Sequence, residues 1–143
     1  MDKHSSEQRS KNMAAIKSTG TTQEVRLAKA LWNLGYRYRK NNKLVFGKPD
    51  ITFKKYKLAI FVDSEFFHGK DFETRKKPGT NTEFWEKKIS GNIKRDRVVN
   101  EKLSLDGWIV LRFWSEKVRK YLPIVLDEII ITLQNIKSRH NDL

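Results

Sequence analysis

The sequence predicts one α/β domain in which helices flank a mixed β-sheet. Two short apolar stretches rich in β-branched and aromatic residues, at residues 51–53 and 58–62, follow each other closely and predict a hairpin. A third apolar stretch, Trp108–Trp114, comes after a long segment of helical periodicity. A helical connection between two strands of one sheet is normally a right-handed crossover. The third strand should therefore lie parallel to a strand of the hairpin.

Each element of the first half has its own signal. The first helix is predicted to begin at Thr21, because a threonine precedes Glu24 by three positions, and to run to about Leu34, before Gly35. We predict an irregular strand over residues 36–46. The hairpin follows, with Lys54–Lys55 as its turn.

The second half begins with residues 66–81, which show no clear period and contain several glycine and proline residues, so we predict a loop. A long helix should run from Thr82 to about Leu105 and end at Asp106–Gly107. Pro123 opens a last helix, since proline is tolerated in the first helical turn. The apolar positions of that helix share one stripe: Val125, Ile129, Leu133 and Ile136.

Length, charge and cysteine content narrow the class of protein. A chain of 143 residues suits a single domain over residues 1–143, and we expect polar residues 1–8 to be disordered. The formal net charge of +13 favours a polyphosphate partner. A basic membrane-surface protein is the competing class, but no long apolar run or signal peptide supports it. Because the chain has no cysteine, disulfides, thiolate zinc sites and cysteine nucleophiles are excluded, and an intracellular protein is expected.

Carboxylates gather at one edge of the predicted hairpin. Asp50 precedes the first strand, and Asp63 and Glu65 follow or end the second, so antiparallel pairing brings them together. Magnesium prefers oxygen ligands and usually takes one or two carboxylates from the protein. We therefore predict a Mg²⁺ site with Asp50 and Asp63 as ligands.

Polar residues also interrupt the apolar face of the long helix. The core-facing positions recur at spacings of four and three: Trp85, Ile89, Asn92, Asp96, Val99 and Leu103. A buried carboxylate is costly unless it is paired or binds a cation or water. Asp96 therefore belongs to a site or forms a structural salt bridge with Arg95, Arg97 or Arg112.

Two further candidates have structural explanations that are favoured when each residue is taken alone. Glu24 faces inward at the start of the first helix, where a capping role would also explain it. His68 lies just beyond the acidic strand end, and histidine is the commonest general acid or base, although a lone loop histidine is often incidental. Phe66 and Phe67 beside it could be core residues or could stack on bases.

Several of these motifs occur together in one known family. The segments concerned are Arg9-Ser10-Lys11-Asn12-Met13, Gly47-Lys48-Pro49-Asp50, Thr82-Glu83-Phe84-Trp85 with Lys88-Ile89, Asn92 and Arg95-Asp96, and Gly107-Trp108 with Val110 and Trp114. They resemble the very short patch repair (Vsr) mismatch endonucleases, a branch of the PD-(D/E)xK nucleases with a restriction-endonuclease-like core. The resemblance covers most of the chain.

The resemblance implies roles for individual residues. Asp50 would bind Mg²⁺ with the backbone carbonyl of Val62, His68 would act on the attacking water, and Glu24 and Asp96 would order metal-bound waters. The family inserts aromatic residues beside the mismatched pair from one groove and a methionine-bearing N-terminal segment from the other. The matching positions are Phe66, Phe67 and Met13, and the lysines that we expect along the DNA backbone, each of which could also be a solvated charge, are Lys48, Lys70, Lys87 and Lys94.

The sequence also departs from the family pattern. Well-studied members hold a structural zinc with Cys and His around the loop after the acidic strand, where this chain has Glu65, Lys70 and Phe72, so no structural zinc is expected. Asp63 replaces a family histidine, and Phe67 replaces a family tryptophan.

The predicted function is Mg²⁺-dependent hydrolysis of a phosphodiester bond in double-stranded DNA by a strand-nicking mismatch-repair enzyme. A sequence-specific restriction or homing endonuclease of the same fold is the first alternative, and a non-catalytic DNA-binding protein is the second. We expect a monomer in the cytoplasm, associated with the nucleoid, with other DNA-repair proteins as further partners and no membrane.

Overall fold

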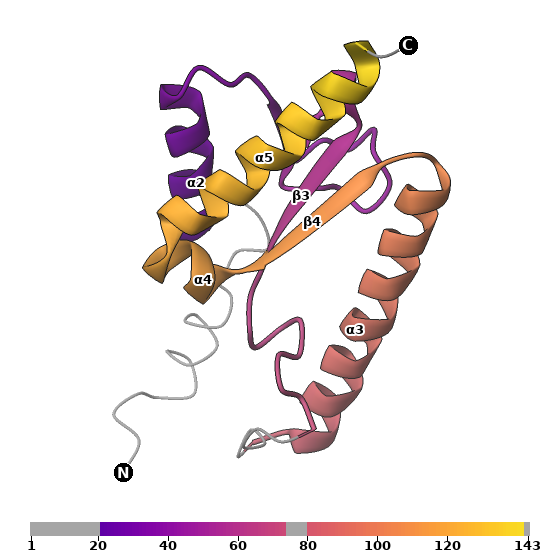
Figure 1. The fold of residues 1–143 in the computed structure, drawn as a ribbon. Coiled ribbons are helices and arrows are strands. Elements are labelled where there is room, and N and C mark those ends of the chain that lie inside the picture. The colour runs from indigo at the N-terminus through magenta and orange to yellow at the C-terminus, as the bar shows by residue number, and fades with distance from the viewer. Residues whose placement is uncertain (1–20, 74–79, 142–143) are drawn as a thin grey trace.

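A computed structural model describes residues 21–73 and 80–141 (Figure 1). The expected disorder of residues 1–8 and the expected role of Met13 lie outside these residues. A four-stranded sheet with the order β1-β2-β3-β4 forms the centre of the fold. Its strands are β1 (Arg39–Lys40), β2 (Ile51–Phe53), β3 (Leu58–Asp63) and β4 (Ile109–Trp114).

The sheet is mixed, as predicted. Strands β1, β2 and β3 pair antiparallel, and the turn between β2 and β3 is a short 3₁₀ helix, η1 (Lys54–Tyr56), closed by Lys57 in the left-handed conformation. Strand β4 pairs parallel to β3, so the parallel pairing predicted from the long helix is confirmed. The arrangement is consistent with a restriction-endonuclease-like core.

Four α-helices surround the sheet in the described part of the chain. They are α2 (Thr22–Asn33), α3 (Thr82–Leu105), α4 (Ser115–Lys120) and α5 (Leu122–Asn141). In Figure 1, α2 and α5 lie beside each other on one side of β3 and β4, and α3 runs along the other side. Among the described residues, no helix combines the length and apolar character needed to cross a membrane.

Alternation along β3 divides the core in two. Leu58 and Ile60 pack with α2 and α5 in a large cluster, whereas Ala59 and Phe61 pack toward α3 in a smaller one. Successive side chains of a strand point to opposite faces. The next position on the α3 side, Asp63, is therefore directed toward α3 rather than toward the main core.

Two segments differ from the sequence expectation. Only Arg39–Lys40 of residues 36–46 is strand, because the chain turns where the buried Asn42 accepts a hydrogen bond from the backbone of Leu44. Strand β4 is followed at once by α4, a short helix that the sequence did not predict. The 24-residue helix α3 begins at Thr82 and ends at Leu105, as predicted.

Candidate active site

The end of β3 opens into a cavity of about 930 Å³. Its walls come from the first residues of α2, the approach to β2, the loop after β3 and one face of α3. The predicted site residues Asp50, Asp63, His68 and Asp96 all line it, together with Arg112 from β4. The structure thus brings these four residues to one place.

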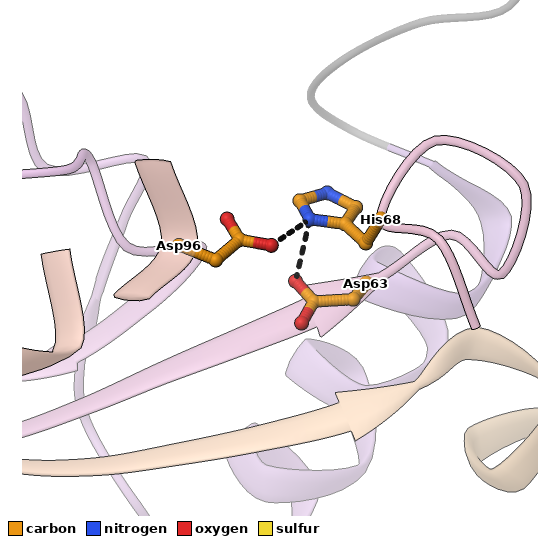
Figure 2. Close-up of side chains that lie close together, drawn as sticks. All are labelled: Asp63, His68 and Asp96. Carbon is orange, nitrogen blue, oxygen red and sulfur yellow. Dashed lines mark hydrogen bonds and ion pairs between the residues drawn. The ribbon is translucent and has the colours of Figure 1, made fainter. Parts of the chain in front are cut away.

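His68 lies between two carboxylates (Figure 2). Its Nδ1 lies 2.6 Å from Oδ2 of Asp96 and 3.7 Å from Oδ1 of Asp63. Because a carboxylate only accepts hydrogen bonds, Nδ1 carries the hydrogen, and Nε2 points away from both carboxylates. Burial by itself would lower the pKa of His68, but the hydrogen bond to Asp96 and the charges of both carboxylates outweigh burial and raise the pKa.

Arg112 is the second positive group in this cluster. Its Nη1 donates to both carboxylate oxygens of Asp63, at 3.0 and 3.1 Å, and lies 3.6 Å from Oδ1 of Asp96. Asp63 is 5 % exposed. Burial raises the pKa of Asp63, although Arg112 and His68 act in the opposite direction.

Asp50 lies in a more negative environment. Its Oδ2 accepts a hydrogen bond of 2.7 Å from the backbone N–H of Val62, which fixes the carboxylate at the β2–β3 edge. Burial raises the pKa of Asp50 to about 7, and the nearby charges of Glu24 and Asp63 add to this effect, while the Val62 hydrogen bond and His68 oppose it. A raised carboxyl pKa means that the ionised form lacks stabilising positive charge. A divalent cation would supply that charge, so the residues around Asp50 fit the metal that the family resemblance implies.

A second set of possible metal ligands lies close enough together to hold a cation. The ligand atoms of Asp63, His68 and Asp96 all lie within 4.8 Å of one another. The chain therefore holds the oxygen and nitrogen donors of a divalent-metal nuclease in one cavity.

Glu24 and Asp96, the acids that interrupt apolar faces in the sequence, both face inward. Glu24 is 1 % exposed at the start of α2, where its backbone N–H donates to the hydroxyl of Thr21. The threonine cap predicted at the start of this helix is therefore present, whereas the capping role of the Glu24 side chain stays a prediction. Asp96 pairs with Arg112, one of the three arginines considered as its partner, and also with His68. The roles of Glu24 and Asp96 in ordering metal-bound water stay predictions.

The aromatic residues after β3 form a cluster with the start of α3. The ring centroid of Phe66 lies 5.1 Å from that of Phe67 and 5.3 Å from that of Trp85. Phe67, Phe84 and Trp85 line the cavity. The sequence reasoning did not assign Phe84 or Trp85 to DNA binding, although their place on the cavity side of α3 follows from the helical period.

The four lysines predicted to follow the DNA backbone do not all lie at the cavity. Lys48 lines it, and Nζ of Lys70 lies 6.0 Å from the ring centroid of Trp114. Lys87 and Lys94 are exposed on α3 outside the cavity lining, which takes Lys88 and Arg95 from that helix instead. A one-residue step turns the helix by about 100°, which separates the two pairs.

Hydrogen bonds fix the loop that carries His68 to two helices. The amide Nδ2 of Asn92 on α3 donates to the carbonyl of Phe67 at 3.0 Å. Glu65 accepts from the hydroxyl of Ser115 and from the backbone N–H of Glu116 at the start of α4, at 2.9 and 2.8 Å. Glu65 stands where family members have a zinc ligand by the resemblance, and here it joins the loop to α4 directly.

Arg112 is the site residue whose position the sequence reasoning left open. It is the only charged residue of β4, and the parallel register places it beside Phe61, two positions before Asp63. A single charge on an otherwise apolar strand was the signal. This signal identifies Arg112 as a site residue only once the pairing of β3 with β4 is known.

Comparisons with known proteins agree with this geometry. The family described as DNA mismatch endonuclease Vsr matches residues 1–74. The chain is 57 % identical over 121 residues to type II nicking enzyme V.NmeDIP of Neisseria meningitidis serogroup C, covering 84 % of this chain and 82 % of that protein. It is 52 % identical over 122 residues to type II nicking enzyme V.HpaIIP of Haemophilus parainfluenzae, covering 84 % and 86 %. It is also 38 % identical over 118 residues to DNA mismatch endonuclease Vsr of Escherichia coli (strain K12), covering 82 % and 76 %. The chain therefore belongs to the Vsr family of DNA mismatch endonucleases, and it is a DNA endonuclease.

Proposed function

We propose that this endonuclease uses Mg²⁺ to cut one strand of double-stranded DNA beside a mismatched base pair. The observation that carries the proposal is the single cavity in which Asp50, Asp63, His68 and Asp96 converge. One such cavity in the described part of the chain suits a one-strand cut. Two of the relatives described above carry the name type II nicking enzyme, which supports a nick over a double-strand break.

Each residue has a distinct task in the proposed reaction. Asp50 and the backbone carbonyl of Val62 would hold Mg²⁺. When bound, Mg²⁺ polarises the scissile phosphate and lowers the pKa of a coordinated water. The charge of Glu24, buried at the start of α2, acts on Asp50 and raises the pKa of Asp50, so we assign Glu24 to ordering water next to Asp50.

His68 is placed to move a proton. Asp96 accepts from Nδ1, which fixes the ring and leaves Nε2 directed away from the carboxylates. Nε2 can then take a proton from the attacking water or pass one to the leaving oxygen. Asp63 was predicted to bind Mg²⁺; its two oxygens accept from Arg112, so we assign it to holding Arg112 and His68 in place.

The proposal extends to the setting of the reaction. The net charge of +13 favours a duplex as partner, and the cavity among residues 21–73 and 80–141 takes all its lining from one chain, which is sufficient for a monomer. We propose one domain over residues 1–143 that acts where chromosomal DNA lies, in the cytoplasm with the nucleoid and with other DNA-repair proteins.

The experiment is a cleavage assay on paired duplexes that differ only at one base pair. Each strand carries its own label, and one series presents every single mismatch in turn. With Mg²⁺ we expect one labelled strand to be cut near a particular mismatch, and EDTA should stop the reaction. Equal cutting of the matched duplex would instead favour a restriction-type enzyme, and cutting of both strands would contradict the nick.

A further inference from the structure

We propose that Arg112 is a positioning residue that closes the Asp63–His68–Asp96 cluster to metal ions and thereby leaves Asp50 as the carboxylate that binds the metal. This inference rests on the proposed metal-dependent cleavage. In addition, it makes the guanidinium of Arg112 a permanent cation of the protein. The position of this cation determines which of two neighbouring sets of ligand atoms binds the metal.

The guanidinium of Arg112 lies directly against the carboxylates of this cluster. Nη1 of Arg112 lies 3.0 and 3.1 Å from the two oxygens of Asp63 and 3.6 Å from Oδ1 of Asp96. A metal shared by Asp63, His68 and Asp96 would need the carboxylate oxygens that this nitrogen already contacts. Arginine stays charged at any ordinary pH, so the group cannot give way by losing a proton.

Further contacts hold Arg112 in place. Its Nε donates to Oδ1 of Asn100 on α3 at 2.7 Å, and its guanidinium carbon lies 4.0 Å from the centroid of the Phe61 ring. Only 17 % of its side chain is exposed. These two contacts fix the guanidinium, so moving it aside for a metal would break a hydrogen bond and a stacking contact.

Charge is distributed differently around the cluster and around Asp50. Asp63 and Asp96 share a permanent cation, and His68 donates to Asp96. Around Asp50 the main charges are two further carboxylates, Glu24 and Asp63, and the opposing positive charge of His68. A divalent cation therefore gains more at Asp50 than in the cluster, even though the ligand atoms of the cluster all lie within 4.8 Å of one another.

Removing Arg112 should open the cluster. Asp63, His68 and Asp96 would then offer two carboxylates and an imidazole, a donor set suited to Mn²⁺ and its neighbours in the transition series. Arg112→Met has similar length without charge, and Arg112→Lys restores the charge without the planar fork.

The test counts Mn²⁺ ions bound per chain, in the absence of DNA, by the electron paramagnetic resonance signal of free Mn²⁺. We expect Arg112→Met to bind one ion more than the wild type, and Arg112→Met with Asp63→Asn to lose that ion again. Arg112→Lys should bind the wild-type number. In the cleavage assay, Arg112→Met should be about 10–100-fold slower because His68 and Asp63 lose their shared support, and Arg112→Lys should recover part of the rate.

Two results would overturn the inference. One is a folded Arg112→Met protein, judged by circular dichroism, that binds the wild-type number of ions. The other needs no Arg112 variant: Asp63→Asn in the wild-type background should leave Mn²⁺ binding unchanged, whereas an abolished site would mean that Asp63 is a ligand. A wild-type protein that fails to cut any duplex would contradict the proposed function, but the ion counts would still decide the role of Arg112.

Discussion

The carboxylate of Asp50 combines burial, two neighbouring acids and a single backbone hydrogen bond. Its pKa is raised to about 7 chiefly because burial disfavours the charged form. The folded protein without metal therefore carries an unfavourable charge at neutral pH, and a bound cation removes that cost. Removing the charge of Asp50 should therefore have opposite effects: it should lower the cleavage rate and raise the stability of the metal-free fold.

Asp50→Asn should abolish nicking while it stabilises the metal-free fold. The folded pKa, about 7, lies above the unfolded value of 3.8, so the folded state binds the proton more tightly, and stability falls as pH rises between these values. The asparagine avoids this loss and keeps an oxygen for the Val62 N–H. We expect the variant to be more stable by about 1–3 kcal/mol at pH 8 in EDTA, with the difference vanishing near pH 4, in urea titrations.

Cleavage by the same variant supplies the second half of the prediction. Loss of a carboxylate that holds the metal should remove several kcal/mol of transition-state stabilisation, or roughly three orders of magnitude in rate. A variant with a tenth of the wild-type rate would show that Asp50 is not the ligand.

Phe67 is the aromatic residue that both lines the cavity and immediately precedes His68. Unstacking a base step costs a few kcal/mol, and a mismatch lowers this cost, so a wedge works best where stacking is already weak. Phe67→Ala should therefore narrow the ratio of single-turnover rates on mismatched and matched duplexes. An unchanged ratio with a clearly lowered melting temperature would place Phe67 in the core instead.

At the scale of elements, the loop after β3 determines where His68 lies. Asn92 holds the carbonyl of Phe67, and Glu65 holds Ser115 and the start of α4. Gly69 packs against α3 so closely that a Cβ atom would lie 2.4 Å from Cδ1 of Ile93. The loop is thus fixed to both helices within five residues of chain, from Glu65 to Gly69.

Gly69→Ala should displace this loop. Its φ of +72° is a conformation that alanine rarely adopts, and the added methyl group would also collide with Ile93. We expect a loss of about 1–3 kcal/mol in unfolding free energy and at least a tenfold lower cleavage rate, because a displacement of about 1 Å at a catalytic group can cost 100-fold.

The matched control for this prediction is Gly91→Ala within α3. A Cβ atom there meets nothing within 4 Å, and alanine favours the helix. The control should keep full activity and gain about 0.5–1 kcal/mol in stability. If Gly69→Ala behaves like the control, the loop does not depend on its contact with α3.

How far the sequence could predict the fold differs between elements. Helix α3 has a clear period and the terminating Asp106–Gly107, so its bounds were predicted correctly. The segment around Asn42 was predicted as strand because side-chain hydrogen bonds that turn the chain leave no periodic signal. Helix α4 has only six residues, too few for a periodic pattern.

The residues of the candidate site also differ in how far the sequence could predict their positions. Periodicity alone directed Glu24 and Asp96 inward, and both lie inward in the structure. Arg112 needed the pairing of β4 with β3, since its partner Asp63 is 49 residues away in sequence. Contacts of that kind depend on the strand register, which composition and spacing do not determine.

At the scale of the whole molecule, the net charge of +13 makes binding to DNA strong and dependent on salt. Charge alone does not say where the duplex lies. The position of the duplex can be tested, because two pairs of positively charged residues with equal spacing lie on different faces of α3. Lys88 and Arg95 line the cavity, whereas Lys87 and Lys94, which the sequence predicted as contacts, lie outside the lining.

Replacing Lys88 and Arg95 together with alanine should weaken DNA binding more than replacing Lys87 and Lys94 together. Both double variants remove two positive charges from the same helix, so their effects on net charge and long-range steering are equal. Only the first pair lies at the cavity, with Nζ of Lys88 5.7 Å from the Trp85 ring centroid. If Lys88 and Arg95 each contact one phosphate, the slope of log affinity against log salt concentration should become shallower by about 2 in the variant that lacks both. Titrations of a labelled mismatched duplex in EDTA at several salt concentrations measure both slopes.

Equal slopes for the two variants would mean that the duplex does not follow the cavity side of α3, and a larger change for Lys87 and Lys94 would place it on the face predicted from the sequence.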